Sequence, residues 1–399
     1  MKHVIIGAGA AGISAAKQIR QLRAEDEIIM ISEDKDIYSR CLLHFYLDGR
    51  RTLDELNFAG VNFAQNSNIT WKSGEKVINI FPQEHTIQLE NDEKITYDKL
   101  CIASGAYTNQ PPILGLSEAG NVVGFRNLDD VKRVKEAMKT AKNVFVMGAG
   151  LIGIDVIEGL LKYNKNITLV DMGPHLLPIQ LDKESAKRYG VMFKKAGVKQ
   201  FYNIGSKQFV LNSDGDCYKV ILTDGTEILT DLVINCAGVR AETRFFQNSG
   251  IECDRFGVLT DDTGQTNMED IYAAGDVTGR RTIWPEAVRE GKIAAVSMCG
   301  ETIQCKDYLS QKASMNFLDI PTVSIGKVNQ CDETYQQEYY RDMEDNYMKI
   351  VYQDGIVKGA ILQGNLEHSG FLTEAVRKGI QQEEMLKEIS QWNGIIRNQ

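Results

Sequence analysis

The chain has 399 residues, of which 43% are hydrophobic and 25% charged, and it carries a formal net charge of −9 at pH 7. This length is enough for two or three domains, each with its own core. The negative charge argues against nucleic acid as a partner, and the longest uncharged apolar run, residues 4–16, is too short to span a membrane.

The eight cysteines of the chain are scattered along it. No two of them follow the Cys-x-x-Cys spacing of zinc and iron–sulfur sites, so we expect no metal centre. A chain of this length with few cysteines and no leader-like segment is typical of a reduced protein, and we expect it in the cytoplasm.

The first 33 residues follow the order strand, glycine turn, helix, strand, carboxylate. An apolar run at residues 3–6 leads into the sequence GAGAAG at 7–12. A helical pattern at 13–22 and a second apolar run at 27–31 come next, and Glu33 closes the unit. This is the dinucleotide-binding fingerprint in its full context.

Each position of this fingerprint has a physical task. Gly7 allows the tight turn, Gly9 lets the backbone approach a pyrophosphate, and Gly12 lets the helix pack on the strand. The start of the helix offers unpaired N–H groups and a positive dipole end to the phosphates. Glu33 is placed to accept hydrogen bonds from a ribose.

The segment after Glu33 is predicted to be mixed. A loop at residues 38–44 leads into a helix, and runs at 76–80, 86–89 and 99–103 alternate as antiparallel strands do. A charged helix at 131–139 ends the segment.

A second fingerprint begins at residue 143. An apolar run is followed by GAGLIG at 148–153, a helix at 154–161, a strand at 167–170 and Asp171. Two complete fingerprints in one chain indicate two bound dinucleotides, or one unit repeated after its site was lost.

The last 170 residues contain three further features. A strand at 231–236 ends in a turn at 237–240, and a loop with a short strand ends in Gly275 and Asp276, ahead of a helix at 288–298. From about residue 307, predicted strands lead to one closing helix at 371–392, which indicates an α+β segment.

Several of these motifs occur together in one known family. The two fingerprints, the turns IASGA (102–106) and CAGVR (236–240) and the motif AAGD (273–276) resemble the FAD-dependent pyridine nucleotide-disulfide oxidoreductase superfamily over roughly the first three quarters of the chain. The loop at 38–40, Trp284-Pro285 and residues 358–362 look most like the branch of NADH:rubredoxin oxidoreductases and the NADH-binding flavin module of nitrite reductase.

The resemblance implies a fold and a domain order. It predicts an α/β protein with two Rossmann-like, three-layer ββα dinucleotide-binding domains, the second inserted in the first, plus a C-terminal α+β domain. The FAD-binding domain would comprise residues 1–110 and 241–306, the NAD(H)-binding domain 111–240, and the C-terminal interface domain 307–399. An interface domain would make the protein a possible homodimer.

The resemblance also implies two sets of binding residues. The FAD set is Gly7, Gly9, Ala10, Ala11, Gly12, Glu33, Arg40, Cys41, Val77, Ala103, Ser104, Gly105, Arg126, Gly275, Asp276 and Trp284. The nicotinamide-nucleotide set is Gly148, Gly150, Leu151, Ile152, Gly153, Asp155, Asp171 and Gly238. Asp276 would bind the ribityl chain, Trp284 would lie near the isoalloxazine, and Gly238 would border the nicotinamide.

Two acids of the second set bear on specificity. Asp171 would accept hydrogen bonds from a 2′-OH and repel a 2′-phosphate, and no arginine follows it, so we expect NADH rather than NADPH. Asp155 stands where the family often has glutamate, and its shorter side chain puts a contact with the nicotinamide in doubt.

The electron acceptor depends on the cysteines. Glutathione-reductase-like members need a second cysteine five positions after Cys41, where Tyr46 stands. Thioredoxin-reductase-like members need Cys-x-x-Cys in the second domain, where Cys236 is alone. The spacing therefore excludes a local redox dithiol.

Cys41 matches the single redox cysteine of NADH peroxidase, NADH oxidase and coenzyme A-disulfide reductase. Beside Arg40 and near a helix start, its thiol is expected to have a lowered pKa. The chain departs from those enzymes in having Ala10 in place of a histidine. A small residue packed under the flavin is the alternative reading of Cys41.

Three functions follow from these patterns. The first is oxidation of NADH with electrons passed through FAD to a small carrier protein such as rubredoxin. The second is a Cys41 thiol enzyme that reduces a small-molecule oxidant: oxygen, peroxide or a disulfide. The third is a flavin- and NADH-binding regulator or electron-input subunit.

Overall fold

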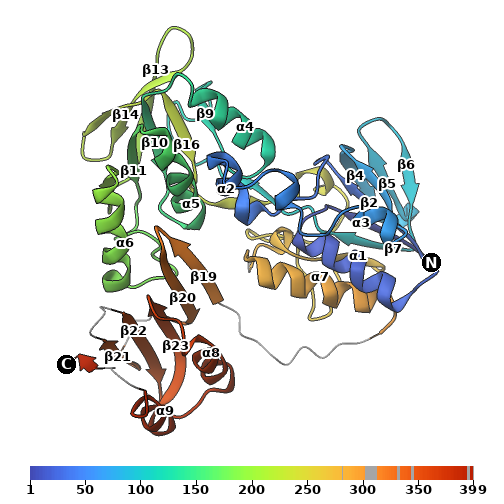
Figure 1. Cartoon of the computed structure of the whole chain (residues 1–399). Helices are drawn as coiled ribbons and strands as arrows, with labels where there is room; N and C mark the ends of the chain where they lie inside the picture. The colour runs from blue at the N-terminus through green and yellow to red at the C-terminus, as the bar shows by residue number, and fades with distance from the viewer. Residues whose placement is uncertain (281, 302–311, 330–332, 343–345, 393–395, 399) are drawn as a thin grey trace. The chain divides into compact units, whose positions relative to one another are not determined.

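The computed structural model describes residues 1–280, 282–301, 312–329, 333–342, 346–392 and 396–398 (Figure 1). The chain divides into two compact units, residues 1–109 with 239–306 and residues 110–238 with 307–399. Arg281 and Cys305 lie outside the described residues. The three-domain division expected from the sequence stays a prediction.

The first unit is built on a parallel five-stranded sheet. Its strands follow the order β18-β7-β1-β2-β3, with bounds Ile271–Ala273, Lys99–Ile102, Lys2–Ile6, Glu27–Ser32 and Thr70–Ser73. One face packs against helices α1 (Ala10–Leu22) and α7 (Trp284–Met298). The other face packs against the antiparallel strands β4 (Val77–Phe81), β5 (Thr86–Leu89) and β6 (Lys94–Thr96). The result is a three-layer ββα arrangement.

The second unit repeats this arrangement. Its parallel sheet follows the order β12-β11-β10-β16-β9, with bounds Lys199–Phe201, Asn166–Val170, Asn143–Met147, Leu232–Asn235 and Val122–Val123. The antiparallel strands β13 (Ser206–Leu211), β14 (Cys217–Leu222) and β15 (Glu227–Leu229) cover one face. Its helices are α4 (Leu128–Ala137), α5 (Leu151–Leu160) and α6 (Lys183–Lys195).

The C-terminal segment forms an antiparallel sheet within the second unit. Its strand order is β19-β20-β23-β22-β21-β24, with bounds Lys312–Phe317, Ile320–Gly326, Ile356–Gln363, Tyr347–Gln353, Tyr335–Arg341 and Ile396–Asn398. Two helices, α8 (Ser369–Lys378) and α9 (Gln382–Ile389), pack on it. The single closing helix expected at 371–392 is therefore wrong, because Gly379 ends α8 in the left-handed region, at φ +66°.

A second expectation from the sequence is also corrected. Residues 99–103 were expected to form an antiparallel strand, but β7 lies inside the parallel sheet between β1 and β18. The run Leu100–Ile102 is fully buried, and a strand that is covered on both faces reads as continuously apolar. Its sequence pattern therefore describes burial rather than pairing direction.

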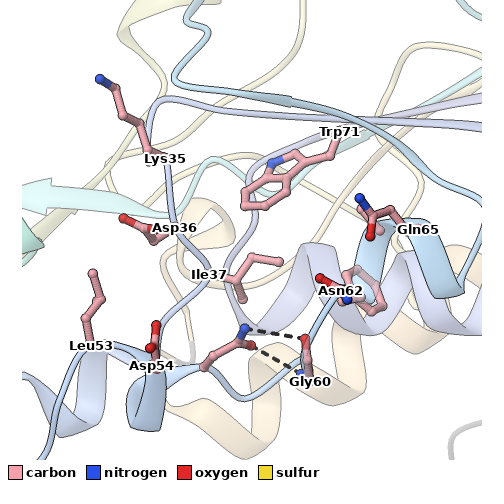
Figure 2. A pocket seen from close by; sticks show the side chains of 12 residues that line it. Lys35, Asp36, Ile37, Leu53, Asp54, Gly60, Asn62, Gln65 and Trp71 are labelled. Atoms are coloured by element: carbon pink, nitrogen blue, oxygen red, sulfur yellow. Dashed lines mark hydrogen bonds between the residues drawn. The ribbon is translucent and has the colours of Figure 1, made fainter.

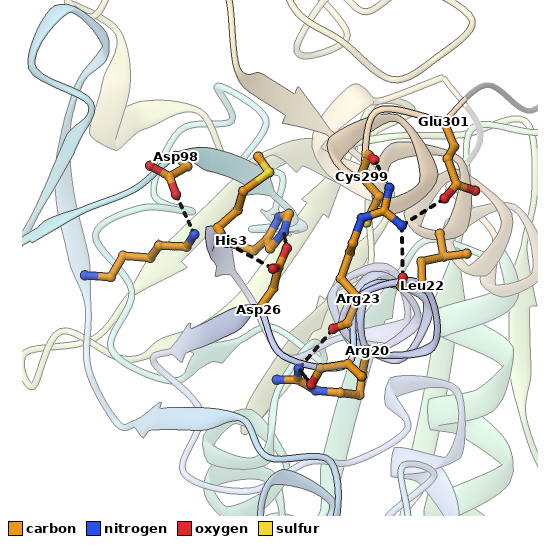
Figure 3. A network of polar contacts seen from close by, with 11 residues as sticks. His3, Arg20, Leu22, Arg23, Asp26, Asp98, Cys299 and Glu301 are labelled. Atoms are coloured by element: carbon orange, nitrogen blue, oxygen red, sulfur yellow. Dashed lines mark hydrogen bonds and ion pairs between the residues drawn. The ribbon is translucent and has the colours of Figure 1, made fainter.

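Polar contacts fix the edge of the first sheet where β1 and β2 begin (Figure 3). The buried His3 ring binds the Asp26 carboxylate, with Nε2 and Oδ2 2.9 Å apart. Arg23, just after α1, donates to the Cys299 carbonyl at 2.5 Å and to the Glu301 carboxylate at 3.0 Å. The C-terminal end of α1 is thus tied to the chain that leaves α7.

Helices α1 and α7 cross at van der Waals contact of their backbones. A Cβ atom added to Gly291 of α7 would lie 2.2 Å from the Ala11 carbonyl oxygen of α1. Only a residue without a side chain permits this approach, which sets the start of α1 against the middle of α7.

We therefore expect Gly291→Ala to lower the free energy of unfolding by about 2 kcal/mol, because the added methyl group forces the two backbones apart. Gly370→Ala in α8 is the matched control, since its Cβ would meet no atom within 4 Å. The control should be neutral or stabilise by up to ~1 kcal/mol through helix propensity. Urea unfolding midpoints measure both, and equal midpoints for the two variants would contradict the close crossing.

Candidate functional site

The first glycine turn combines two crowded positions with one open position. Gly7 has φ +111°, and a Cβ there would lie 2.2 Å from the Ala103 carbonyl oxygen. A Cβ on Gly12 would lie 1.9 Å from the carbonyl oxygen of Gly7. At Gly9 the added atom would meet nothing within 4 Å, so protein packing does not account for the glycine at that position.

The second glycine turn has the same geometry. Gly148 has φ +110°, and its Cβ would lie 2.4 Å from the Cys236 carbonyl oxygen. A Cβ on Gly153 would lie 1.9 Å from the Gly148 carbonyl oxygen, and at Gly150 it would meet nothing within 4 Å. Both turns therefore leave a bare stretch of backbone facing space that no protein atom fills.

Both turns lead directly into a helix whose start suits an anion. Gly9 is the N-cap of α1 and Gly150 the N-cap of α5, and neither supplies a capping side chain. The first turn of each helix also lacks an acidic residue. The N–H groups and the positive dipole end thus point toward the open space, which fits the pyrophosphate of a dinucleotide.

The residues expected to bind FAD gather at the carboxyl edge of the first sheet. The turn at residues 7–12, Glu33, the turn at 103–105 and the pair at 275–276 each follow a neighbouring strand. Backbone hydrogen bonds hold these strand ends level, such as Ala103 N–H to Ile6 carbonyl at 2.8 Å. This edge is where parallel α/β sheets bind ligands.

The turn that carries Asp276 packs on the start of α1. Gly275 has φ +81°, and its Cβ would lie 2.9 Å from that of Ala11. The N–H of Gly275 donates to the Glu290 carboxylate of α7 at 2.8 Å. Asp276 follows at once, half-buried beside the glycine turn. Glu290 is a supporting residue that the sequence patterns did not single out.

Five residues of the FAD set have identified partners or surroundings in the same unit. Arg40 donates to the Asp34 carboxylate at 2.6 Å. Ser104 donates its hydroxyl to the Glu242 carbonyl at 2.9 Å, and Trp284 contacts the ring of Phe58 edge-on at 4.6 Å between centroids. Val77 is buried at the start of β4, whereas Glu33 is exposed.

One residue of the expected FAD set lies in the other unit. Arg126 precedes α4, where its backbone N–H donates to the Asp130 carboxylate at 2.7 Å. Its contact with FAD stays a prediction.

The residues expected to bind the nicotinamide nucleotide follow the strands of the second sheet. Asp171 comes directly after β11, and its carboxylate accepts from the N–H groups of Ala149 and Gly173, each at 2.5 Å. Leu151 and Ile152 open α5, next to the glycine turn. Gly238, at φ +87°, ends the turn after β16 with open space around it.

Asp155 lies half-buried in the second turn of α5. Its burial, together with the negative charge of Glu158, raises the pKa of its carboxyl well above the usual range. A raised pKa favours the protonated form, so Asp155 differs in character from the hydrogen-bonded carboxylate of Asp171.

The cysteines differ in exposure. Burial raises the pKa of the Cys101 thiol to about 12, and burial with the charge of Asp155 raises that of Cys236. Of the cysteines that the structure describes, Cys41 and Cys253 are exposed. Partial desolvation of the Cys253 thiol, together with the charge of Asp254, raises its pKa. Cys41 is thus the exposed thiol at the edge where the expected FAD residues gather.

A separate pocket of about 240 Å³ is lined by the chain segment that connects β2 to β3 and by Trp71 of β3 (Figure 2). Ile37, Phe63 and Trp71 line it with apolar surface, and Asp36 and Asp54 contribute carboxylates. The indole N–H of Trp71 has no hydrogen-bond partner among the described residues. None of the lining residues belongs to the two expected binding sets.

The part of the chain that the structure describes contains neither a cluster of metal-ligating side chains nor a membrane-spanning helix. No group of three or more His, Cys, Asp or Glu side chains there is arranged to hold a metal ion. None of the described helices has the length and apolar character needed to cross a bilayer.

Comparisons with known proteins agree with this architecture. The family model described as pyridine nucleotide-disulphide oxidoreductase matches residues 1–291, and that of the rubredoxin NAD+ reductase C-terminal domain matches residues 313–380. A solved NAD-dependent persulfide reductase from A. fulgidus superposes with a TM-score of 0.88 at 23% identity, over 97% of this chain and 79% of that one. The expected α/β fold class is confirmed.

Two relatives cover nearly the whole chain. It is 27% identical to a nitrite reductase (NAD(P)H) of Bacillus subtilis over 94% of this chain and 47% of the relative. It is 24% identical to an NADH-rubredoxin oxidoreductase of Clostridium acetobutylicum over 100% of this chain and 99% of the relative. The chain thus spans about half the length of the nitrite reductase.

The open glycines supply a matched pair of variants. Gly9 and Gly150 have φ of −83° and −75°, which any residue adopts, so Gly9→Ala and Gly150→Ala should change unfolding free energy by less than ~0.5 kcal/mol. Each added methyl group would enter the open space where we expect a pyrophosphate to bind. We expect Gly9→Ala to weaken FAD binding, and Gly150→Ala to weaken NADH binding with FAD retained, each by about tenfold.

Flavin absorbance after gel filtration and NADH titration of the flavin-loaded protein measure these two affinities. Each variant is the control for the other. Loss of both cofactors from both variants would contradict the expectation that the two glycine turns bind FAD and NADH separately.

His44 provides a pH test of the same unit. Its ring is buried, and burial with the nearby Arg50 charge lowers its pKa from 6.5 to about 4. The unfolded chain therefore binds the proton first, and stability is lost as the pH falls from about 6.5 to about 4. The loss amounts to about 3 kcal/mol.

We expect His44→Gln to remove this part of the pH dependence in urea unfolding between pH 7 and 4. His85→Asn, at a less buried histidine, is the control. Parallel stability curves for the protein and His44→Gln would show that His44 titrates normally when folded.

Proposed function

The chain belongs to the pyridine nucleotide-disulphide oxidoreductase family, the FAD-dependent oxidoreductases of NAD(P)H, and we propose that it oxidises NADH and passes the electrons to a small carrier protein of the rubredoxin type. The observation that supports this acceptor is the match of residues 313–380 to the rubredoxin NAD+ reductase C-terminal domain. The absence of a second cysteine near Cys41 supports it as well, because electrons then have no dithiol to enter.

The first glycine turn would hold FAD. The bare backbone at Gly9 and the start of α1 suit the pyrophosphate. Glu33, after the adjacent strand β2, would bind the ribose, and Asp276, after β18 on the far side of β7, would bind the ribityl chain. When bound, FAD supplies the chemistry that accepts a hydride from NADH and releases electrons singly. The chain's own task is to bind and orient the two cofactors.

The second glycine turn would hold NADH. The Asp171 carboxylate is fixed by the N–H groups of Ala149 and Gly173, and its remaining lone pairs can accept from the 2′-OH of a ribose. A 2′-phosphate would meet this negative charge at close range. We therefore infer a preference for NADH over NADPH.

No side chain is needed as an acid or base for the hydride step. His44, close to Cys41 in the sequence, is buried and its pKa is lowered to about 4, so at pH 7 it does not carry the extra proton that an imidazolium acid would donate. The sequence places two arginines side by side at 280–281, a pair that could dock an acidic carrier. The Arg280 guanidinium, however, donates to the Asp254 carboxylate at 2.7 Å, so we do not assign the docking surface to Arg280.

Two other functions have specific support. Exposure of Cys41 at the expected flavin edge favours a thiol enzyme acting on a small oxidant. The match to about half of a nitrite reductase favours an electron-input module whose partner carries out the reduction. A cytoplasmic location and a homodimer remain predictions from the sequence.

Anaerobic titration of the FAD-loaded protein separates the three. A carrier reductase should take up about two electrons per FAD and then reduce rubredoxin when NADH is present. Cys41→Ser and Cys253→Ser should leave this uptake unchanged, Cys253 being the other exposed cysteine that the structure describes. Steady-state reduction of rubredoxin, peroxide and coenzyme A disulfide ranks the acceptors.

Other outcomes identify the alternatives. Uptake of about four electrons that only Cys41→Ser reduces would establish the thiol enzyme. Fast flavin reduction without turnover on any of the acceptors would favour an input module. A folded protein that binds no FAD would end all three proposals.

A further inference from the structure

We propose that the C-terminal sheet positions the loop that follows Asp171, the residue expected to bind the ribose of the nicotinamide nucleotide, and that Asn329 is the positioning residue. The nucleotide loop is defined here as residues 172–182, between Asp171 and the start of α6. The identity of the ligand rests on the proposed function, whereas the contacts between sheet and loop do not.

Asn329, a few residues after β20, binds the nucleotide loop through three carbonyl groups. Its Nδ2 lies 2.8 Å from the carbonyl oxygens of Pro178 and Leu181 and 3.3 Å from that of Ile179. Its amide carries two N–H groups, so one of them is shared. These contacts join parts of the chain about 150 residues apart, and they hold the loop at residues 178–181.

A buried ion pair holds both sides of this contact. Lys349 of β22 is only 2% exposed, and its ammonium group donates to the Val328 carbonyl at 2.9 Å and lies 3.4 Å from the Asp182 carboxylate. Val328 precedes Asn329, and Asp182 ends the nucleotide loop. Lys349 therefore holds both Val328, next to Asn329, and Asp182, the last residue of the loop.

Asp182 is itself held from both directions. Its carboxylate accepts from the Tyr347 hydroxyl at 2.6 Å and caps α6 by accepting from the Ser185 N–H at 3.0 Å. The end of the nucleotide loop is thereby tied to both β22 and α6.

The nucleotide loop passes this constraint to the glycine turn. Leu177 is fully buried and has φ +51°, a left-handed conformation that a leucine adopts only when its surroundings hold it there. Its N–H donates to the Ala149 carbonyl at 2.8 Å, and the Ala149 N–H donates to Asp171. The path from Asn329 to the expected ribose carboxylate consists of contacts within one compact unit.

Loss of the Asn329 side chain should therefore loosen the second glycine turn, expected to bind NADH, and leave the first turn, expected to bind FAD, unchanged. Without the amide, three loop carbonyls lose their donor, and Leu177 can relax to negative φ and release Ala149. Apart from Arg126, the expected FAD residues lie in the other compact unit, around a separate parallel sheet. NADH affinity should fall while FAD content stays constant.

The test compares Asn329→Ala with Asn365→Ala in the full-length, FAD-loaded protein. Asn365 is an exposed asparagine of the same segment whose side chain accepts from the nearby Glu367 N–H at 2.8 Å. We expect Asn329→Ala to raise the dissociation constant and KM for NADH about tenfold, with kcat at saturating NADH within about twofold of the unchanged protein. Asn365→Ala should match the unchanged protein in all three quantities.

Amide hydrogen exchange in the unaltered protein provides a measurement that needs no variant. The Leu177 amide should be protected, and it should open in the same cooperative unit as the amides of β22 and β23. In Asn329→Ala it should exchange at least tenfold faster.

The outcomes separate this inference from the proposed function. Failure of the unaltered protein to bind NADH would overturn the proposed function. Amide exchange at Leu177 would then still decide whether the C-terminal sheet holds the loop in place. Equal NADH affinity in the protein and a folded Asn329→Ala would overturn the positioning role. So would a Leu177 amide that opens independently of the C-terminal sheet, which decides the matter if Asn329→Ala does not fold.

Discussion

The structure depends on two places where a helix meets the turn before it with no side chain between them. Gly12 lies so close to the Gly7 carbonyl that a Cβ would come within 1.9 Å, and Gly153 stands in the same relation to Gly148. A helix that could not approach this far would be displaced from its strand. Its N–H groups would then point away from the edge of the sheet.

The first glycine of each turn extends this constraint to a neighbouring strand. Gly7 faces the carbonyl that follows β7, and Gly148 faces the one that follows β16, in both cases with φ near +110°. Turn, helix and the adjacent strand end are therefore fixed together. This explains how residues from positions 7 to 276 come to one sheet edge: each lies at the end of a strand that the glycine turn helps to align.

The sequence predicted these parts because their signals are local. Three glycines, two apolar runs and an acid lie within about 30 residues in each fingerprint, and the geometry follows from backbone sterics alone. The start of α1 was placed at residue 13 instead of 10, since Ala10 and Ala11 read as part of the glycine motif. The local sequence pattern therefore predicts which helices and strands form more accurately than it predicts the residues at which they begin and end.

The parts that the sequence did not predict depend on distant partners. The alternation at residues 99–103 could not reveal that β7 is covered on both faces by segments from elsewhere in the chain. The break at Gly379 depends on the left-handed conformation that this glycine adopts. Asn329 and Lys349 belong to no motif, and their importance is visible only once the carbonyls of the nucleotide loop lie beside them.

The contact between α6 and the C-terminal sheet includes buried polar groups, and these bear on what that sheet does. The Tyr189 hydroxyl contacts the Ile320 carbonyl at 2.6 Å and the Thr322 hydroxyl at 2.7 Å, and the Lys349–Asp182 pair is buried nearby. Burying an ion pair costs desolvation energy that apolar residues of the same size would avoid, so such a pair is weak evidence for stability. Hydrogen bonds, however, require a narrow range of distances and angles. Apolar contacts place no such requirement on the orientation of the two surfaces. The sheet is therefore attached to α6 in one orientation, and the loop that enters α6 is held in a fixed position relative to it.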